Sequence, residues 1–369
     1  MTRESLMNAD WLGTIDRLGG VEKLEKEARE CGAFRRAREV KCAVDLLRLT
    51  LAYCLGSKGL RWTAGWAESI GLASLSNVAL LKRLRKSVPW LLALVGRLIG
   101  PPDQPVIGAA QGRLIRIVDA TVVAKAGAEA REAGGVWRVH AVYNLPSEQF
   151  SAFELTDESE GERVDRAAVV PGEIRIADRA YLQPDRIAKV LAAGADIIVR
   201  AKWNGARWQD GDGDKLDLIA VLKKARGKGL LDQPIWIKGT AKKPIALRLV
   251  AIRKPRQAIA ETIAKLKRKA VRKGHALQPE TVIAAEWVIL VTSLDAKAFP
   301  LHAVGELYRM RWRIEIAFKH LKSGAGLVRP PGEDPDVAMA HILCHLLLIL
   351  LTEPLIAEHL GASPRRAAA

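Results

Sequence analysis

The chain contains 369 residues with a formal net charge of +17, a sequence pI near 9.9 and four scattered cysteines. Its length exceeds what one hydrophobic core usually organises, which excludes a single small domain and predicts two or three. The cysteines lack CxxC spacing and the N-terminus lacks a signal-peptide pattern, which argues against a disulfide-built secreted protein and predicts a cytoplasmic one. The positive charge predicts a polyanionic partner such as nucleic acid.

Residues 1–105 are predicted to form a helical N-terminal domain, because apolar residues recur there at helical spacing. Within it, residues 63–86 resemble a helix-turn-helix: TAGWAESIG, a turn at Gly71 to Ser74, and SNVALLKRLRK opened by the possible cap Ser76. Two interpretations stay open, a DNA contact through the second helix and a helical bundle whose basic face is only solvated. The candidate DNA-binding residues on that helix are Lys82, Arg83 and Arg85.

Strand-like segments begin after this helical region. RLIRIVDATVV, VWRVHAVYNL and QFSAFELTDE are rich in β-branched or aromatic residues and are separated by turn formers. EIRIADRAY, a helix and the strand DIIVRAKW follow. Three meandering strands and then alternating strand and helix predict an α/β fold with a ribonuclease H-like mixed sheet, assigned to residues 106–202 and 286–345.

Residues 203–285 are predicted to be a mainly β basic insertion subdomain within this core. Residues 223–273 contain seventeen Lys and Arg against two acidic residues, a local charge of +15, together with strand-like runs and Trp236. A disordered basic segment is the alternative, but these runs favour a folded basic platform. Residues 346–369 are assigned to a C-terminal helix and tail. The apolar run AMAHILCHLLLILL, residues 338–351, is shorter than the roughly 20 residues of a membrane span, which favours a buried helix and no membrane association.

The segment YRMRWRIEIAFKHLKSG is predicted to be one helix carrying a polar stripe. At about 100° per residue, Tyr308, Arg311, Glu315 and Lys322 fall within roughly 60° of arc. A carboxylate beside two cations and a phenol suits a site that holds a metal and grips phosphate oxygens. The alternative is an ordinary surface pair of Arg311 with Glu315, four residues apart.

Two aspartates are predicted to end strands of the sheet, Asp119 after IRIV and Asp178 after IRIA. If these strands are neighbours, the two carboxylates lie close together. Phosphodiester cleavage benefits from two divalent ions held by oxygen ligands, which these aspartates and Glu315 could supply. Taken singly, each aspartate could equally be a turn or helix cap.

The spacing Y-x2-R-x3-E-x6-K, together with IRIVDATVV and IADRAY, resembles the signature of DDE transposases of the insertion-sequence-four family. The resemblance implies a ribonuclease H-like core, nicking at the ends of a mobile element, and strand transfer into target DNA. It implies Asp119, Asp178 and Glu315 as the catalytic residues and metal ligands, holding two Mg²⁺ ions for which Mn²⁺ can substitute. It also implies phosphate contacts from Tyr308, Arg311 and Lys322.

Further expectations follow from the same resemblance. An aromatic of the insertion stacks on a flipped base, for which Trp203 and Trp208 are candidates, with a buried strand anchor as the alternative role of either. Arg179, directly after Asp178, is a further candidate DNA contact. The partners are double-stranded DNA, as element ends and target, and a second copy of the chain in a homodimer. The alternatives are a ribonuclease H-like nuclease without joining activity and a non-catalytic DNA-binding protein derived from a transposase.

Overall fold

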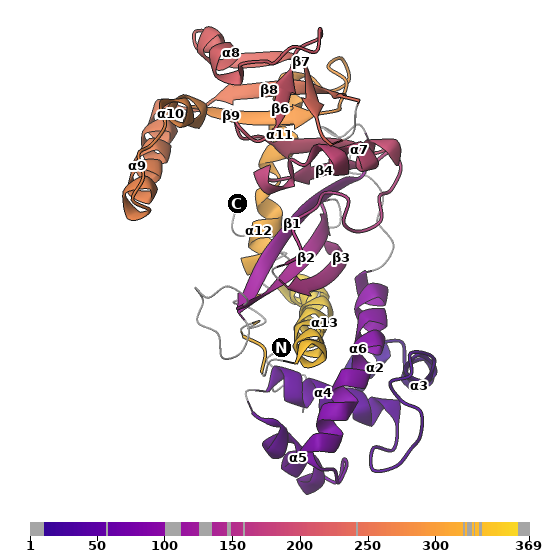
Figure 1. The fold of residues 1–369 in the computed structure, drawn as a ribbon. Helices are drawn as coiled ribbons and strands as arrows, with labels where there is room; N and C mark the ends of the chain where they lie inside the picture. Colours follow the sequence, from indigo (N-terminus) through magenta and orange to yellow (C-terminus); the bar gives the residue numbers. More distant parts are fainter. Residues whose placement is uncertain are drawn as a thin grey trace.

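In a computed structural model, the chain forms a helical part at one end and a large mixed sheet at the other (Figure 1). The structure describes residues 11–360 apart from 57, 100–111, 125–134, 146–148, 158, 241–242, 320–321, 323–326, 328 and 332–333, and without the side chains of 99 and 353–360. The predicted N-terminal domain and C-terminal tail therefore include residues 1–10 and 361–369 that lie outside the described part.

The described residues from 11 to 99 form helices and turns without a strand. The predicted cap Ser76 accepts a hydrogen bond from the Ala79 amide at 3.2 Å, which satisfies a free donor at the start of α6. Before it, Gly71 adopts φ +68°, a left-handed conformation that glycine tolerates and that turns the chain after α5. A helix, a turn and a second helix thus lie where the sequence predicts them. These elements are α2 (Trp11–Arg17), α3 (Val21–Glu30), α4 (Ala43–Leu55), α5 (Leu60–Ser69) and α6 (Asn77–Ile99).

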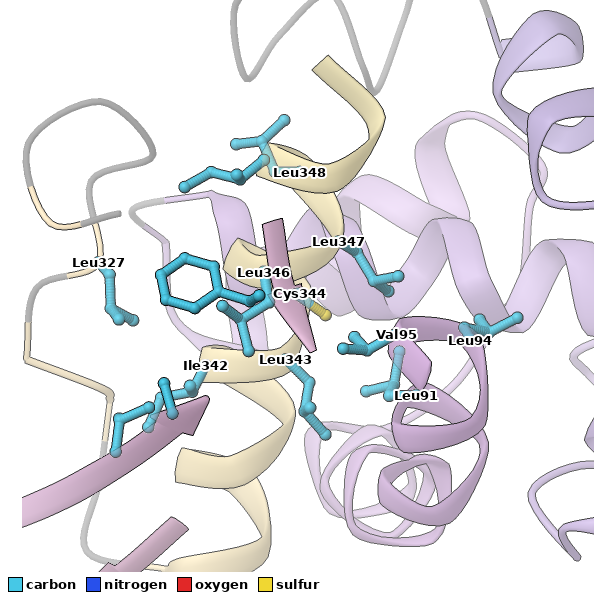
Figure 2. Packing of buried hydrophobic residues seen from close by; sticks show 14 of the residues in the cluster. Leu91, Leu94, Val95, Leu327, Ile342, Leu343, Cys344, Leu346, Leu347 and Leu348 are labelled. Atoms are coloured by element: carbon cyan, nitrogen blue, oxygen red, sulfur yellow. The ribbon is translucent and has the colours of Figure 1, made fainter. Parts of the chain in front are cut away.

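Helix α13 (Pro335–Leu360) completes the helical part by packing against α6 and α4. In Figure 2, Leu343 and Leu347 of α13 point toward Leu91 and Val95 of α6. Among the described residues, α13 is the one helix long and apolar enough to cross a membrane, but 83% of its apolar window is buried within the protein, as in a core helix. The predicted boundary between core and C-terminal segment, at residue 346, falls inside this helix.

The sheet has nine strands in the order β3-β2-β1-β4-β5-β9-β8-β7-β6. The pairs β1–β4 and β4–β5 are parallel and the other neighbours are antiparallel, so a mixed α/β sheet, as predicted, is confirmed. Helix α7 (Pro184–Ala192) makes the crossover from β4 to β5. The strands of the predicted core are β1 (Ile115–Ala124), β2 (Val136–Asn144), β3 (Gln149–Asp157), β4 (Ile174–Ala177), β5 (Asp196–Arg200) and β9 (Trp287–Thr292).

Both faces of the sheet are buried where β1 pairs with β4 and along β5, which explains the continuous buried runs of these strands. Ile117 of β1 and Ile176 of β4 belong to the hydrophobic cluster shared with the helical part. Their neighbours Val118 and Ala177 point to the opposite face and join a second cluster with α7 and α8. The sheet therefore holds the end of the β1–β4 ladder between two hydrophobic clusters.

The predicted insertion contains helices as well as strands, and its strands extend the same sheet. Strand β8 pairs with β9 over six residues and β7 pairs with β8 over eight, so residues 207–253 continue the hydrogen-bonded ladder. The division into separate domains stays a prediction. The elements are β6 (Arg207–Gln209), α8 (Leu218–Ala225), β7 (Leu230–Lys238), β8 (Ile245–Arg253), α9 (Arg256–Arg272) and α10 (Pro279–Ala285).

The prediction of one continuous helix through Tyr308, Arg311 and Glu315 is wrong. Helix α11 (Leu301–Arg309) ends before Met310, and α12 (Trp312–Lys319) begins two residues later. At the break, the Met310 amide bonds to the Leu307 carbonyl and the Arg311 amide to that of Tyr308, each at 3.1 Å. Such bonds to the third residue back tighten the last turn of a helix. Because neither glycine nor proline marks the break, helical periodicity could not predict it.

Candidate functional site

The candidate site begins where strands β1 and β4 separate. The two strands run parallel, and their last paired residues are Val118 and Ala177. Asp119 and Asp178 follow these two residues directly, so the register delivers the two aspartates side by side. The prediction that Asp178 ends its strand is confirmed. Asp119 does not end β1, which continues along β2 to Ala124, but it does end the ladder with β4.

The guanidinium of Arg311 joins Asp119 to Glu315. Its Nη1 lies 3.3 Å from Oδ2 of Asp119, and its Nη2 lies 2.5 Å from Oε1 of Glu315. The side chains of Arg311 and Asp119 are 15% and 17% exposed, whereas Glu315 is 57% exposed. The pair of Arg311 and Glu315 is therefore more than a surface contact, because its arginine end is held within the site.

The carboxyl group of Asp119 sits in an environment that resists its ionisation. Burial raises its pKa from 3.8 to about 6, against the opposing effects of the Ala120 amide, which donates to it at 2.8 Å, and of Arg311. The negative charges of Asp178 and of Glu162, from the loop between β3 and β4, raise it further. Glu162 was not predicted from the sequence, where it is one glutamate in a loop without a motif. A cation added beside Asp119 would relieve this unfavourable charge.

Tyr308 and Lys322 complete the predicted group of four. The hydroxyl of Tyr308 lies 3.5 Å from Oδ1 of Asp178, and burial raises the pKa of this phenol. Nζ of Lys322 donates to the Val122 carbonyl of β1 at 2.8 Å, farther along the strand that carries Asp119. All four residues thus contact β1, Asp178 or one another, although they do not lie on one helix.

A cavity of about 570 Å³ adjoins Tyr308 and Arg311. Its lining includes Arg200 and Lys254 but no carboxylate among the described residues. The pKa of Lys254 is lowered by burial and then by the positive charges of Arg200 and Arg179, so these three cations lie close together here. Arg179, a predicted DNA contact, is exposed at this place. The cavity suits an anionic ligand.

The two candidate tryptophans, Trp203 and Trp208, differ in burial and in hydrogen bonding. Trp208 is 5% exposed and its indole donates to the Trp203 carbonyl at 2.6 Å, so it is a buried strand anchor. Trp203 is half-buried and donates to the Thr281 hydroxyl at 3.3 Å. Trp312, which lines the cavity, was missed in the sequence although it lies directly after Arg311.

The basic residues of α6 lie away from this site, in the helical part of the molecule (Figure 1). Lys82 is exposed and Arg83 is half-buried. Arg85 is occupied by Asp334, with Nε donating to Oδ2 at 2.7 Å. Asp334 also accepts from the amides at the start of α13. Arg85 therefore ties α6 to α13, which makes it a less available DNA contact than Lys82.

The three predicted carboxylates are oxygen donors of the kind that a divalent cation binds, and two of them lie close enough together to share one. Asp119 and Asp178 offer adjacent carboxylate oxygens, the ligands that Mg²⁺ and Mn²⁺ prefer, and the negative charge of Asp178 adds to the main effect of burial in raising the pKa of Asp119. Among the described residues, no three His, Cys, Asp or Glu side chains lie close enough to hold a metal ion. Glu315 is the member that stands apart, since its carboxylate turns to Arg311.

Comparison with known proteins adds to this geometry. Residues 110–351 match the family model of the transposase DDE domain, a range that includes all four residues of the Y-R-E-K spacing. The chain is 36% identical over 363 residues to the protein named as transposase InsL of insertion sequence element IS186A from Escherichia coli K12, covering 97% of each chain.

Two further transposases are similar to this chain over different lengths. The transposase for insertion sequence element IS421 from Escherichia coli is 36% identical over 364 residues, again with 97% of each chain covered. The transposase for insertion sequence element IS231F from Bacillus thuringiensis subsp. israelensis is 24% identical over 239 residues, which cover 57% of this chain and 49% of that one. The similarity to the first two extends beyond the matched domain into the helical part.

Proposed function

The chain belongs to the DDE transposase family, and on that premise we propose that Asp119, Asp178 and Glu315 are the catalytic carboxylates of its DNA cleavage and strand transfer. The observation that carries this assignment is the register of β1 and β4, which places two aspartates side by side at the end of a parallel ladder. Arg311 then connects the first aspartate to the glutamate.

Enzymes of this family use divalent metal ions, and we propose Mg²⁺, as two ions, with Mn²⁺ able to substitute. Asp119 and Asp178 would hold the metal, joined by Glu315 once its carboxylate leaves Arg311. A bound metal would activate a water or the 3′-hydroxyl of a DNA end and would stabilise the departing oxygen. The protein contributes by positioning, because two half-buried aspartates at the end of the β1–β4 ladder hold their carboxylates in one place.

The cations around these carboxylates would hold the DNA strand. Arg311, once released by Glu315, offers a planar group that binds a phosphate with two hydrogen bonds. Lys322 and Arg179 would neutralise neighbouring phosphates, and the Tyr308 hydroxyl would donate to a phosphate oxygen near the scissile bond. Trp203 stays the candidate for stacking on a splayed base, since Trp208 is buried in the sheet.

The helical part would bind the terminal inverted repeats through α5 and α6, with Lys82 and Arg83 as phosphate contacts and Arg85 in a supporting role. The proposed reaction is cut-and-paste transposition by a ribonuclease H-like core with its basic insertion, acting as a homodimer that holds two DNA ends. Association with DNA in the cytoplasm accords with the net charge of +17.

The test compares wild type with Glu315→Gln on a DNA that carries the inverted repeats flanking the coding sequence, scoring cleavage and joining separately. The expected result is metal-dependent cutting and joining in wild type and neither in the variant, with end binding retained. Glu306→Gln, at an exposed position of α11, is the matched control and should behave as wild type. Cutting without joining would support a nuclease, and binding without cutting would support a non-catalytic DNA-binding protein.

A further inference from the structure

Helix α9 projects from the sheet with most of its surface in solvent. It leaves the end of β8 and returns through α10, and Figure 1 shows it extending beside the sheet rather than across it. Of its seventeen residues, Ala270 alone is buried. A long helix with so little burial gains little from the hydrophobic effect, so its sequence is free to serve a surface role.

The helix divides into an apolar side and a basic side. Ile259, Ile263, Leu266 and Ala270 recur at helical spacing, are half-buried or buried, and form the side that faces the protein. At about 100° per residue, a second set lies within roughly 100° of arc on the far side. This basic stripe consists of Lys265, Arg268, Lys269 and Arg272.

All four residues of the basic stripe are exposed, and none forms an ion pair with another described residue. Two pairs within it, Lys265 with Lys269 and Arg268 with Arg272, are four residues apart and repel each other, which destabilises an isolated helix. Glu261, the one acidic residue of α9, lies four residues before Lys265 on this side, but its carboxylate accepts from Gln257 at 3.2 Å and a single carboxylate does not offset four cations. Helix stability therefore does not explain the stripe, whereas a polyanion bound along it does.

We infer that the basic stripe of α9 binds the phosphate backbone of target duplex DNA. This inference rests on the proposed function, because strand transfer must hold an element end and a target duplex together. Helices α5 and α6, proposed for the element ends, lie in the helical part, whereas α9 lies at the β8–β9 side of the sheet, beyond β1 and α12 (Figure 1). Long cationic side chains that contact phosphates read no sequence, which is what an arbitrary target requires.

The experiment compares two double variants that remove the same charge from one helix. Arg268→Gln with Arg272→Gln alters the stripe, and Arg256→Gln with Lys267→Gln alters exposed positions outside it. Each is measured for binding to a duplex without any terminal repeat, over a salt series and without metal, and circular dichroism checks the fold. Each phosphate contact contributes about −0.9 to the slope of log affinity against log salt, so the stripe variant should lose up to about 1.8 from the slope and the control nearly nothing.

Equal slopes in the two variants would overturn the inference, since net charge alone would then account for binding. A second readout uses pre-cleaved element ends: the stripe variant should join them to target roughly tenfold more slowly while cutting intact ends like wild type, given loss of these phosphate contacts. If the stripe variant lost cutting and joining to the same extent, α9 would contact the element ends and not the target, which would overturn the inference. Because the salt series needs no catalysis, it remains decisive even if wild type fails to cut and the proposed function is wrong.

Discussion

Replacing Asp119 by asparagine should stabilise the metal-free protein at neutral pH while abolishing cleavage. In the folded protein the pKa of Asp119 is raised from 3.8 to about 6, mainly by burial. At about 1.36 kcal/mol for each tenfold change in acidity, that rise corresponds to about 3 kcal/mol of folding free energy lost when the group is ionised. The asparagine carries no charge, so Asp119→Asn avoids that loss.

Because the pKa of Asp119 is raised in the folded protein, the free energy of unfolding decreases as the pH rises. The folded state binds the Asp119 proton more tightly than the unfolded chain does, so wild-type stability falls as pH rises from about 4 to 6 and stays lower above 6. Urea unfolding of both proteins with EDTA should therefore show the advantage of Asp119→Asn growing across this window to about 3 kcal/mol at pH 8. Adding Mg²⁺ should stabilise wild type selectively.

The matched control is Asp196→Asn, which breaks a hydrogen-bonded ion pair with Arg113 at 2.6 Å and should destabilise the protein at pH 8. The reasoning about Asp119 would be refuted if its asparagine variant were less stable than wild type at pH 8, or if the difference between the two did not change between pH 4 and 8.

Three other substitutions test individual contacts. Arg311→Lys should slow cleavage roughly tenfold or more, because a single ammonium cannot join the two carboxylates that the guanidinium contacts; an unchanged rate at saturating Mg²⁺ would contradict this. Trp208→Ala should cost roughly 3–5 kcal/mol in urea unfolding, and Trp203→Ala clearly less, since only the former is fully buried; equal costs would argue against the anchor role. Asp334→Ala should cost about 1–2 kcal/mol in thermal unfolding by uncapping α13, more than Arg85→Ala, which removes the ion pair alone; the reverse order would contradict the capping assignment.

The site residues could be predicted from sequence because their chemistry and spacing are local. IRIVD and IRIAD each combine a buried strand with an aspartate, and the Y-R-E-K spacing is read directly from the chain. Their proximity depends on the pairing of β1 with β4, which joins segments separated by β2 and β3. No local sequence pattern specifies that register, so the sequence predicts that Asp119 and Asp178 are adjacent only if these two strands are neighbours.

Other features could not be predicted because tertiary packing decides them. Local patterns predict strands within residues 207–253, but they do not show that β8 pairs with β9 and so extends the central sheet. A deletion of residues 223–273, attractive from the charge pattern, would remove β7 and β8 with their buried residues Ile235 and Leu249. Point substitutions on α9 are therefore the appropriate way to test the basic region.

The role of Arg311 also depends on tertiary structure. In the sequence it belongs to the polar stripe predicted to grip phosphates, with an ordinary surface pair with Glu315, four residues away, as the alternative. In the fold, the break between α11 and α12 lets the same guanidinium reach Asp119 on β1. The periodicity of the sequence predicts a continuous helix there. It reflects the spacing of side chains along one element and contains no information on contacts with another element, such as that of Arg311 with Asp119.

The most direct test of the central claim is cleavage of a DNA bearing the element's flanking repeats by wild type and Asp178→Asn, each with and without Mg²⁺. The account predicts cutting at the element end by wild type with Mg²⁺, no cutting without it, and none by the variant, while both proteins bind the end equally. Cutting by Asp178→Asn at the wild-type rate would contradict the assignment of the two neighbouring aspartates as the catalytic site.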